Sequence, residues 1–471
     1  MANGAGNNMV TVLEHCRVSP PLDLSVTENI LPLTFFDMQW LNWPSPGCVY
    51  FYDFPCSTTV FKQILVPHLK KSLALTLKHY YPLCGNLITP KTLSDSTTPA
   101  IRYLKGNSVS LVVAEFGGTP SQGFDHLSGN HARDVDKLFA LVPELPPGST
   151  HTDVHNNIHI SPVMSVQVTL FPDHGYSIGY RNSHVVMDGR TLSNFIKTWA
   201  SINSKQLIGE DDYDNLDTIP FYDRSVIKDP KGIASILLRD CLRTRHQKDY
   251  KKASAPAVHN NSLVDATLIL DRGQIQGLKN LVSAQVPHVS TFVVVCAYVW
   301  TCMAKTRAAL GQEMNNENQV EEHFIFAMDT RDRLDPPIPS NYFGNTIVPC
   351  LATLKTSELV REKGFGNAVK EIRNALYENI NNEEGPLKGL ETFFDRIEAT
   401  RGQTKFGVAG SPKFDNYSAD FGWGKPKKYE IVTEKFGLSG SKESEGGLEL
   451  GFCFPEIEMH AFTAIFTQRI T

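Results

Sequence analysis

The sequence predicts an α/β protein with mixed β-sheets in two domains, on the basis of three observations. With 471 residues, the chain is longer than one hydrophobic core usually extends. Short β-branched and aromatic runs alternate with stretches of helical apolar spacing. An acidic, aperiodic segment at 208–232 interrupts this alternation near the middle. We therefore expect an N-terminal domain over 1–210, a crossover segment over 211–260 and a C-terminal domain over 261–471.

The first half contains three runs typical of strands, at 48–54, 108–116 and 164–182. The third run includes the turn sequence PDHG and therefore indicates a hairpin. Between the first two runs, the apolar spacing from Phe61 to Leu77 predicts a helix, with Pro67 near its start or at a kink. A further helix is predicted after the hairpin, because apolar residues recur there along one face. These residues are Leu192, Phe195, Ile196 and Trp199.

The second half is predicted to contain elements of the same kinds. We expect strands at 263–271, 323–334 and 448–454, and helices at 272–284 and 456–470. The apolar run 291–304 is shorter than the roughly 20 residues that cross a bilayer, so it indicates a buried segment of a core.

Composition and charge argue against several classes of function. A net charge of −5 is unlike the basic surface of a nucleic-acid-binding protein. The N-terminus has no basic stretch followed by an apolar one, so no secretory signal is predicted. The nine cysteines are scattered without a CxxC pair, which is typical of reduced thiols and predicts no metal site. We expect a soluble, cytosolic protein that binds neither nucleic acid nor membranes.

The sequence RNSHVVMDGRT at 181–191 places His184 between a predicted strand and a predicted helix. Histidine can take up and return a proton near neutral pH, and a strand end can present its ring to a cavity. Asp188 cannot easily point the same way as His184, so we expect it to fix the loop through an arginine, while Gly189 permits a tight turn. The alternative is structural: Asp188 is a helix N-cap and the histidine is incidental.

A second motif, YSADFGWGKP at 417–426, combines two glycines, an aspartate and a tryptophan before the β-type run KYEIVT. We interpret this motif first as a structural turn, in which Trp423 fills a gap and Asp420 is paired. A functional loop is the alternative interpretation.

Together, HVVMDG and DFGWG resemble the two signature motifs of the plant BAHD acyltransferases, which use acyl-CoA donors. NYFGNT at 341–346 resembles the YFGNC motif of the subgroup that acylates anthocyanins and other phenolic glycosides, with Thr346 in place of the cysteine. Other stretches are similar to this subgroup and notably to its malonyltransferases: LPLTFFD, YPLCGNL, IPFYDRSVIKDP, STFVVVCAYVW and AGSPKFD. The resemblance extends from about residue 9 to the end of the chain.

The resemblance implies a two-domain fold like that of chloramphenicol acetyltransferase, with a channel between the domains. His184 would be the general base in this channel, deprotonating an acceptor hydroxyl for direct attack on the thioester, without an acyl-enzyme. Asp188 would pair with Arg331 of the second domain. Asp420 is often given as a second catalytic residue in the family, although we expect its role to be structural. The residues that would support the two motifs are Gly189, Gly422, Trp423 and Gly424.

The resemblance also implies where acyl-CoA binds. The positions are Lys197, Ser290, Thr291, Phe292, Ser411, Pro412 and Lys413. The phosphates of CoA need charge-assisted contacts, which these lysines could supply. No P-loop or GxGxxG motif is present. The alternative interpretation of each lysine is a solvated surface charge. A malonyl carboxylate would need a buried arginine. Arg190 is preferred for this role, because Arg181 should face the opposite side of its strand from His184.

We therefore expect a monomeric acyl-CoA-dependent O-acyltransferase that needs no cofactor. Its expected reaction transfers malonyl from malonyl-CoA to the sugar 6-hydroxyl of a phenolic, flavonoid or anthocyanin glucoside. A hydroxycinnamoyl-CoA donor for the same glucosides is one alternative. A non-catalytic binding protein with the same fold is another.

Overall fold

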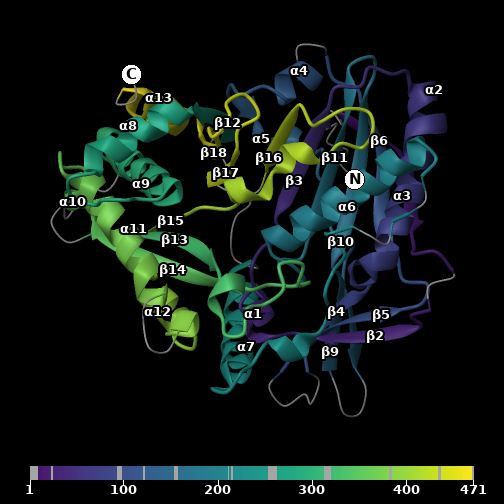
Figure 1. Ribbon diagram of the computed structural model, residues 1–471, viewed down its shortest axis with the longest axis horizontal. Helices are drawn as coiled ribbons and strands as arrows, with labels where there is room; N and C mark the ends of the chain where they lie inside the picture. The colour runs from purple at the N-terminus through teal and green to yellow at the C-terminus, as the bar shows by residue number, and fades with distance from the viewer. Residues whose placement is uncertain are drawn as a thin grey trace.

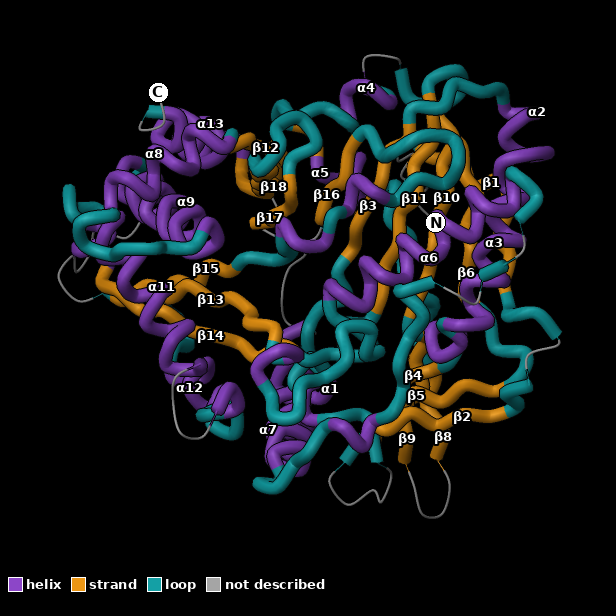
Figure 2. Tube along the Cα trace, viewed as in Figure 1, coloured by secondary structure: helices purple, strands orange, loops and turns teal. Residues whose placement is uncertain are grey.

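The computed structural model describes residues 9–22, 25–92, 98–119, 122–152, 157–210, 212–213, 216–252, 263–311, 320–380, 385–432 and 436–468. Within these ranges the strands form sheets of six, four, three and five strands. Figures 1 and 2 show two lobes side by side, one built mainly from the first half of the chain and one from the second. The α/β fold class with mixed sheets is therefore confirmed.

The first lobe is built on the six-stranded sheet. Its strands, in order across the sheet, are β1 (Val10–Val18), β6 (Val109–Phe116), β10 (Met164–Phe171), β11 (Gly175–Asn182), β3 (Gly47–Tyr52) and β16 (Lys428–Ile431). The five-stranded sheet has the order β2 (Glu28–Pro32), β5 (Ala100–Leu104), β4 (Asn86–Pro90), β9 (Asn157–Pro162) and β8 (Ser149–Thr152). The helices of this half are α1 (Phe35–Met38), α2 (Thr58–Val60), α3 (Val66–His79), α4 (Phe124–Leu127), α5 (Val135–Phe139) and α6 (Gly189–Leu207).

The second lobe contains the two smaller sheets. One has the order β17 (Phe436–Gly440), β18 (Leu448–Pro455), β12 (Leu263–Leu270) and β7 (Arg133–Asp134), and the other β14 (Ile347–Lys355), β13 (Glu321–Asp329) and β15 (Thr404–Gly407). The helices of this half are α7 (Ile233–Lys252), α8 (Arg272–Val282), α9 (Thr291–Ala309), α10 (Thr356–Leu359), α11 (Gly364–Ile380), α12 (Phe393–Ala399) and α13 (Glu456–Thr467).

The helices predicted from apolar spacing are present in the first lobe. Pro67 is the second residue of α3, and a π-helical turn over Phe61–Leu65 leads into it. Because α2, this turn and α3 form one unbroken helical run over 58–79, Pro67 lies within a helix and not at its start, next to an irregular turn of the kind that accompanies prolines in helices. The predicted stripe of α6 faces the core, where Phe195 and Trp199 are fully buried, and α6 packs against α3 (Figure 1).

Helix α9 is the core helix of the second lobe. It is long and apolar enough to cross a membrane, and it is the one such helix in the described parts of the chain. However, 78% of its apolar window is buried, because α9 packs against α8, α11 and α13. This burial confirms the prediction that the run 291–304 belongs to a core.

Two strands cross between the lobes. β16, late in the chain, pairs with β3 of the first lobe, whereas β7, early in the chain, pairs with β12 of the second lobe. The predicted domain limits do not include these exchanges, and the limits themselves stay a prediction. Each lobe is thus completed by a strand from the other half of the sequence.

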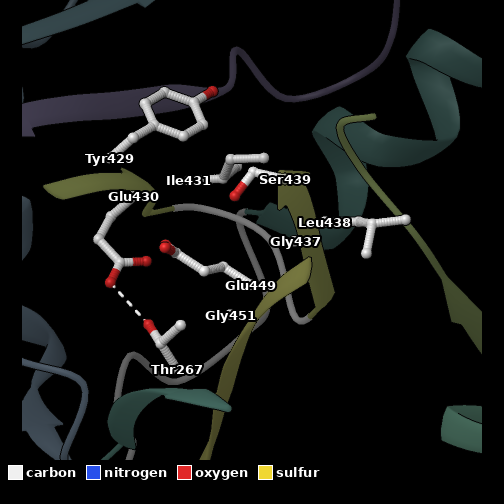
Figure 3. Close-up of a pocket in the computed structure, with 9 residues that line it drawn as sticks. All are labelled: Thr267, Tyr429, Glu430, Ile431, Gly437, Leu438, Ser439, Glu449 and Gly451. Carbon is white, nitrogen blue, oxygen red and sulfur yellow. Dashed lines mark hydrogen bonds between the residues drawn. The ribbon is translucent and has the colours of Figure 1, made fainter. Parts of the chain in front are cut away.

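Buried charges join the sheets where these strands cross. Arg133 Nη2 on β7 lies 2.6 Å from Asp265 Oδ1 on β12 and 2.7 Å from Glu430 Oε1 on β16. Figure 3 shows the small cavity beside them, with the hydrogen bond from Thr267 to Glu430 and the facing Glu449. Burial and the charge of Glu430 raise the pKa of Asp265, against the opposing charge of Arg133. The three-residue pairing of Arg133, Asp265 and Glu430 therefore holds the exchanged strands together.

Candidate functional site

His184 lies in the short loop between β11 and α6. Its imidazole is stacked on the indole of Trp40, with ring centroids 3.9 Å apart and an interplanar angle of 13°. Nδ1 of His184 is buried without a hydrogen-bond partner, although the residue as a whole is only partly buried. Burial lowers the pKa of His184, and the opposing effects of its own carbonyl, Asp188, Asn345 and Asp37 are smaller. The ring is therefore neutral near pH 7, which is the state in which it can accept a proton.

The backbone of the histidine loop is held by Asn345 of the NYFGNT motif. Asn345 Nδ2 donates to the carbonyl oxygens of His184 at 3.0 Å and Val185 at 3.1 Å, and to Asp37 Oδ1 at 3.0 Å. Asp37 is fully buried on α1 and lies 3.6 Å from the guanidinium of Arg224. Buried carbonyls are costly without partners, so Asn345 fixes this loop against both α1 and the second lobe.

Asp188 serves both of the roles that the sequence left as alternatives. Its Oδ1 accepts from Thr191 N at 3.0 Å and so caps α6. The carboxylate also receives two hydrogen bonds from the guanidinium of Arg331, at 2.8 and 3.2 Å, and one from Thr346 N at 3.2 Å. Burial raises the pKa of Asp188, but Arg331 and the backbone donors outweigh it and lower the pKa overall. The pair predicted between the two lobes is present.

The turn with Ser411, Pro412 and Lys413 lies beside the first turns of α6. Ser193 Oγ donates to the carbonyl of Phe414 at 2.8 Å. A Cβ on Gly189 would lie 2.5 Å from the Phe414 ring, so a larger residue there would displace the ring. Burial lowers the pKa of Lys197 in the next turn, and the charge of Asp415 opposes that effect. The structure thus brings together four of the predicted donor-site positions: 197 and 411–413.

Two of the remaining predicted donor-site residues, Phe292 and Arg190, contact β13. Ser290 caps α9 through Val293 N, and Phe292 contacts Phe326 with ring centroids 5.8 Å apart. Phe326 precedes Asp329 by three residues in β13, or about 10 Å of strand. Arg190 Nε lies 3.2 Å from Asp329 Oδ2. The start of α9 and the first turn of α6 are therefore linked through one strand.

Arg181 and Arg190 are both already engaged. Arg181 donates to the carbonyls of Pro143 and Ser45, at 2.9 and 3.2 Å, and lies 3.2 Å from Glu144. It therefore contacts a different segment from Arg190, which agrees with the prediction that it faces away from His184. Arg190 and its partner Asp329 are each about one-third exposed.

The DFGWG loop lies at the other end of α6 from His184. Asn203 Nδ2 donates to the carbonyl of Phe421 at 2.6 Å, and the fourteen residues from the start of α6 to Asn203 span about 20 Å. Asp420 Oδ1 accepts from the backbone N of Gly422 at 2.7 Å and of Gly424 at 3.1 Å. The position of Asp420 near the far end of α6 and its two backbone contacts favour a structural role, and the predicted catalytic role stays a prediction. Its contacts are those of the structural turn.

Trp423 packs at this distant end of α6. Its ring lies 5.9 Å from that of Phe54 and 6.3 Å from that of Tyr176. These contacts agree with the interpretation that Trp423 fills a gap beside the first sheet. Neither Trp423 nor the glycines of the motif contacts the histidine loop in the described structure.

Four residues of the site were not identified as functional from the sequence: Asp37, Trp40, Arg224 and Asn345. Each lies in or next to a stretch that carries the family resemblance, namely LPLTFFD, IPFYDRSVIKDP and NYFGNT. That resemblance was the available signal, but it did not say which side chains meet His184.

The neutral ring of His184 lies in a loop that Asn345 and Asp188 hold between the two lobes, an arrangement that suits general-base catalysis. The chain matches the model of the Transferase family over residues 8–468, so it belongs to that family and the BAHD resemblance is confirmed. The fold matches the crystal structure of vinorine synthase with a TM-score of 0.65, at 19% identity and over 96% of each chain. This likeness confirms the predicted fold family.

Relatives over nearly the whole chain are glucoside acyltransferases. A malonyl-coenzyme A:anthocyanin 3-O-glucoside-6''-O-malonyltransferase of Dahlia pinnata is 39% identical, covering 98% of this chain and 97% of the relative. Phenolic glucoside malonyltransferase 1 of Nicotiana tabacum is also 39% identical, covering 98% and 100%. A coumaroyl-CoA:anthocyanidin 3-O-glucoside-6''-O-coumaroyltransferase of Arabidopsis thaliana is 34% identical, covering 98% and 97%.

Proposed function

We propose that this acyltransferase moves malonyl from malonyl-CoA to the sugar 6-hydroxyl of a phenolic, flavonoid or anthocyanin glucoside. The observation that carries the proposal is the neutral, partly accessible His184 at the head of α6, within a chain 39% identical to two glucoside malonyltransferases. The non-catalytic alternative does not account for a base that is held by Asn345 and, through its loop, by Asp188.

The proposed reaction needs one base and no covalent enzyme intermediate. His184 accepts the proton of the acceptor hydroxyl as the oxygen attacks the thioester carbonyl, and a tetrahedral intermediate forms. Its collapse breaks the carbon–sulfur bond, and the imidazolium returns the proton to the leaving sulfur. The products are the malonyl ester and CoA, and His184 is again neutral.

The donor is proposed to bind between Lys197, the 411–413 turn and the start of α9. Lys197 is half-buried beside the turn, and the first N–H groups of α9 point away from the helix. Both features suit the phosphates and the polar chain of CoA. Arg190 is the proposed partner of the malonyl carboxylate, and it would have to exchange or share Asp329 to bind it.

A hydroxycinnamoyl donor remains the second proposal, favoured by one observation. Arg181 and Arg190, which flank the histidine motif, are already paired with carboxylates, so binding a malonyl carboxylate would require one of these pairs to rearrange. An uncharged aromatic acyl group would leave both pairs intact. The coumaroyl-transferring relative has the same overall length match as the malonyl-transferring ones.

A competition assay separates these proposals. The full-length protein is incubated with equal malonyl-CoA and coumaroyl-CoA and a phenolic glucoside, and products are identified by mass. The matched acceptors are the corresponding xyloside, which lacks the 6-hydroxymethyl group, and the free aglycone. We expect malonylation of the glucoside alone. Coumaroylation instead, or equal transfer to the xyloside, would contradict the donor or the acceptor position respectively.

The role of the base is tested in the same assay. His184→Gln keeps a polar side chain of similar size but cannot cycle a proton. We expect its rate to fall by about 100- to 10,000-fold. Turnover at the wild-type rate would rule out His184 as the base.

We also propose that the protein acts as a cytosolic monomer. Of the nine cysteines, seven are buried and the other two are partly buried, and scattered thiols of this kind suit a reducing compartment. Size-exclusion chromatography with light scattering should give the mass of one 52.4 kDa chain.

A further inference from the structure

Trp40 covers one face of the His184 ring, and its indole N–H makes no hydrogen bond. The two rings are nearly parallel, with 3.9 Å between centroids. The indole Nε1 is buried and has no hydrogen-bond partner. Because no hydrogen bond orients the indole, its orientation depends on packing, and the stack on His184 is a main contact of this side chain.

The backbone around Trp40 is fixed to the same segments that hold the histidine loop. Trp40 N donates to the carbonyl of Asp37, and the side chain of the neighbouring Gln39 donates to the carbonyls of Phe36 at 2.9 Å and Ile347 at 2.7 Å. Ile347 begins β14 directly after the NYFGNT motif. The backbone that carries the indole is therefore held by contacts that do not involve His184.

We propose that Trp40 is a positioning residue for His184: its indole face sets the plane of the imidazole and stabilises the imidazolium formed when the base takes the acceptor proton. This inference rests on the proposed function for its chemistry. In the step concerned, the acceptor O–H bond breaks and an N–H bond forms on His184. The positive charge then lies against the π face of an indole, which attracts cations more strongly than other aromatic faces.

Two carboxylates also act on the ring, and each has an arginine partner. Asp37 on α1 lies 3.6 Å from Arg224, and Asp188 in the motif loop is paired with Arg331. Both carboxylates favour the protonated form of His184, although burial outweighs them and lowers its pKa. In the proposal, the ring face of Trp40 adds to their stabilisation of the transient cation.

The size of the effect follows from general cation–π strengths. Loss of the indole face should lower the pKa of His184 by about 0.4–1.5 pH units. The same loss should slow kcat by about 2- to 30-fold, because the transition state carries part of the imidazolium charge. Leucine is the informative replacement, since it keeps apolar bulk over the ring and prevents water from reversing the shift.

The experiment compares Trp40→Leu, Trp40→Phe and the control Trp43→Leu in the full-length protein. Trp43 contacts Trp40 at 5.4 Å between centroids and is 46% exposed, so it reports on the surface without touching His184. The pKa of His184 is measured from the pH dependence of its modification by diethylpyrocarbonate, followed by mass spectrometry of its peptide. This readout needs no substrate, so it holds even where the proposed malonyl transfer fails.

We expect a downward shift for Trp40→Leu, a smaller one for Trp40→Phe and none for Trp43→Leu. The acid limb of the kcat/KM profile should move in parallel. An unchanged or raised pKa of His184 in folded Trp40→Leu would overturn the proposal. If Trp40→Leu does not fold, the tryptophan fluorescence of the wild type is measured as a function of pH instead. It should change at the pKa of His184, and this change should be absent in His184→Gln. A pH-independent emission would also overturn the proposal.

Discussion

Removal of the Arg331 guanidinium is the sharpest test of how the histidine loop is held. Arg331 and Asp188 are each 1% exposed, and two hydrogen bonds join them. In Arg331→Leu the carboxylate of Asp188 would keep its backbone donors, Thr191 and Thr346, but lose its countercharge. The variant therefore leaves a buried anion next to the loop that carries His184.

The expected penalty is large enough to measure. Breaking a buried pair by removing one partner costs about 3–5 kcal/mol. Unfolding entropy of about 2.1 cal/mol/K per residue amounts to roughly 1 kcal/mol/K over 471 residues. Arg331→Leu should therefore lower Tm by about 3–5 °C if the chain unfolds as one unit. We also expect a lower kcat, because the start of α6 and the base share this loop.

The pH dependence of the penalty has a definite sign. The pKa of Asp188 is lowered in the folded protein, so its contribution to stability is present above the unfolded pKa, near 3.9, and is lost as pH falls through the folded pKa. Without Arg331, burial raises that pKa instead. The difference in Tm between wild type and Arg331→Leu should therefore shrink as pH falls from 7 toward 5.

Two further variants complete this test by thermal unfolding. Arg331→Leu combined with Asp188→Asn removes the buried anion and should recover part of the loss. Arg401→Leu breaks an exposed pair with Glu398 and should change stability by no more than about 1 kcal/mol. If Arg331→Leu behaves like Arg401→Leu in both Tm and rate, the pair does not hold the site.

Two predictions concern the DFGWG motif. Asp420→Asn keeps an oxygen acceptor for Gly422 N and Gly424 N, so its kcat should stay within a few-fold of wild type. Asp420→Ala removes that acceptor and should lower the free energy of unfolding by about 1–3 kcal/mol. A loss of about 100-fold in kcat for Asp420→Asn at unchanged Tm would instead support a catalytic role. Gly422 has φ +89°, and a Cβ added there would lie 2.6 Å from the side chain of Leu207. Gly422→Ala should therefore lower the free energy of unfolding by about 1–3 kcal/mol, and an unchanged Tm would contradict this.

Local patterns in the sequence predicted the strands and the helix that flank the histidine loop, because the physics behind such patterns is local. The period-2 runs became β10 and β11, and the stripe with Phe195 and Trp199 became the buried face of α6. Asp188 and Arg331 were paired through a family resemblance, and the geometry shows that the pair is bidentate. Periodicity and turn chemistry report on neighbours within a few residues, and these elements depend on little else.

Contacts between distant segments were beyond the reach of such patterns. Nothing in the run KYEIVT indicates that β16 pairs with β3. The paired residues Ile431 and Cys48 are some 380 positions apart in the sequence. Likewise, the stack of Trp40 on His184 depends on how α1 meets the histidine loop. Partner choice of this kind is decided by burial and shape across the assembled core, which single-sequence patterns do not report.

The positions of the two motifs on α6 separate their roles. The histidine loop precedes the helix, whereas Phe421 is bonded to Asn203 near its end. Tyr52 on β3 donates to the carbonyl of Ala419 at 3.0 Å, and β16 joins β3 shortly afterwards. The DFGWG loop thus anchors the exchanged strand on the first lobe, and that strand in turn positions Glu430 against Arg133. Because the loop helps to hold the lobes in register around His184, we expect its variants to change stability before they change the pH dependence of the base.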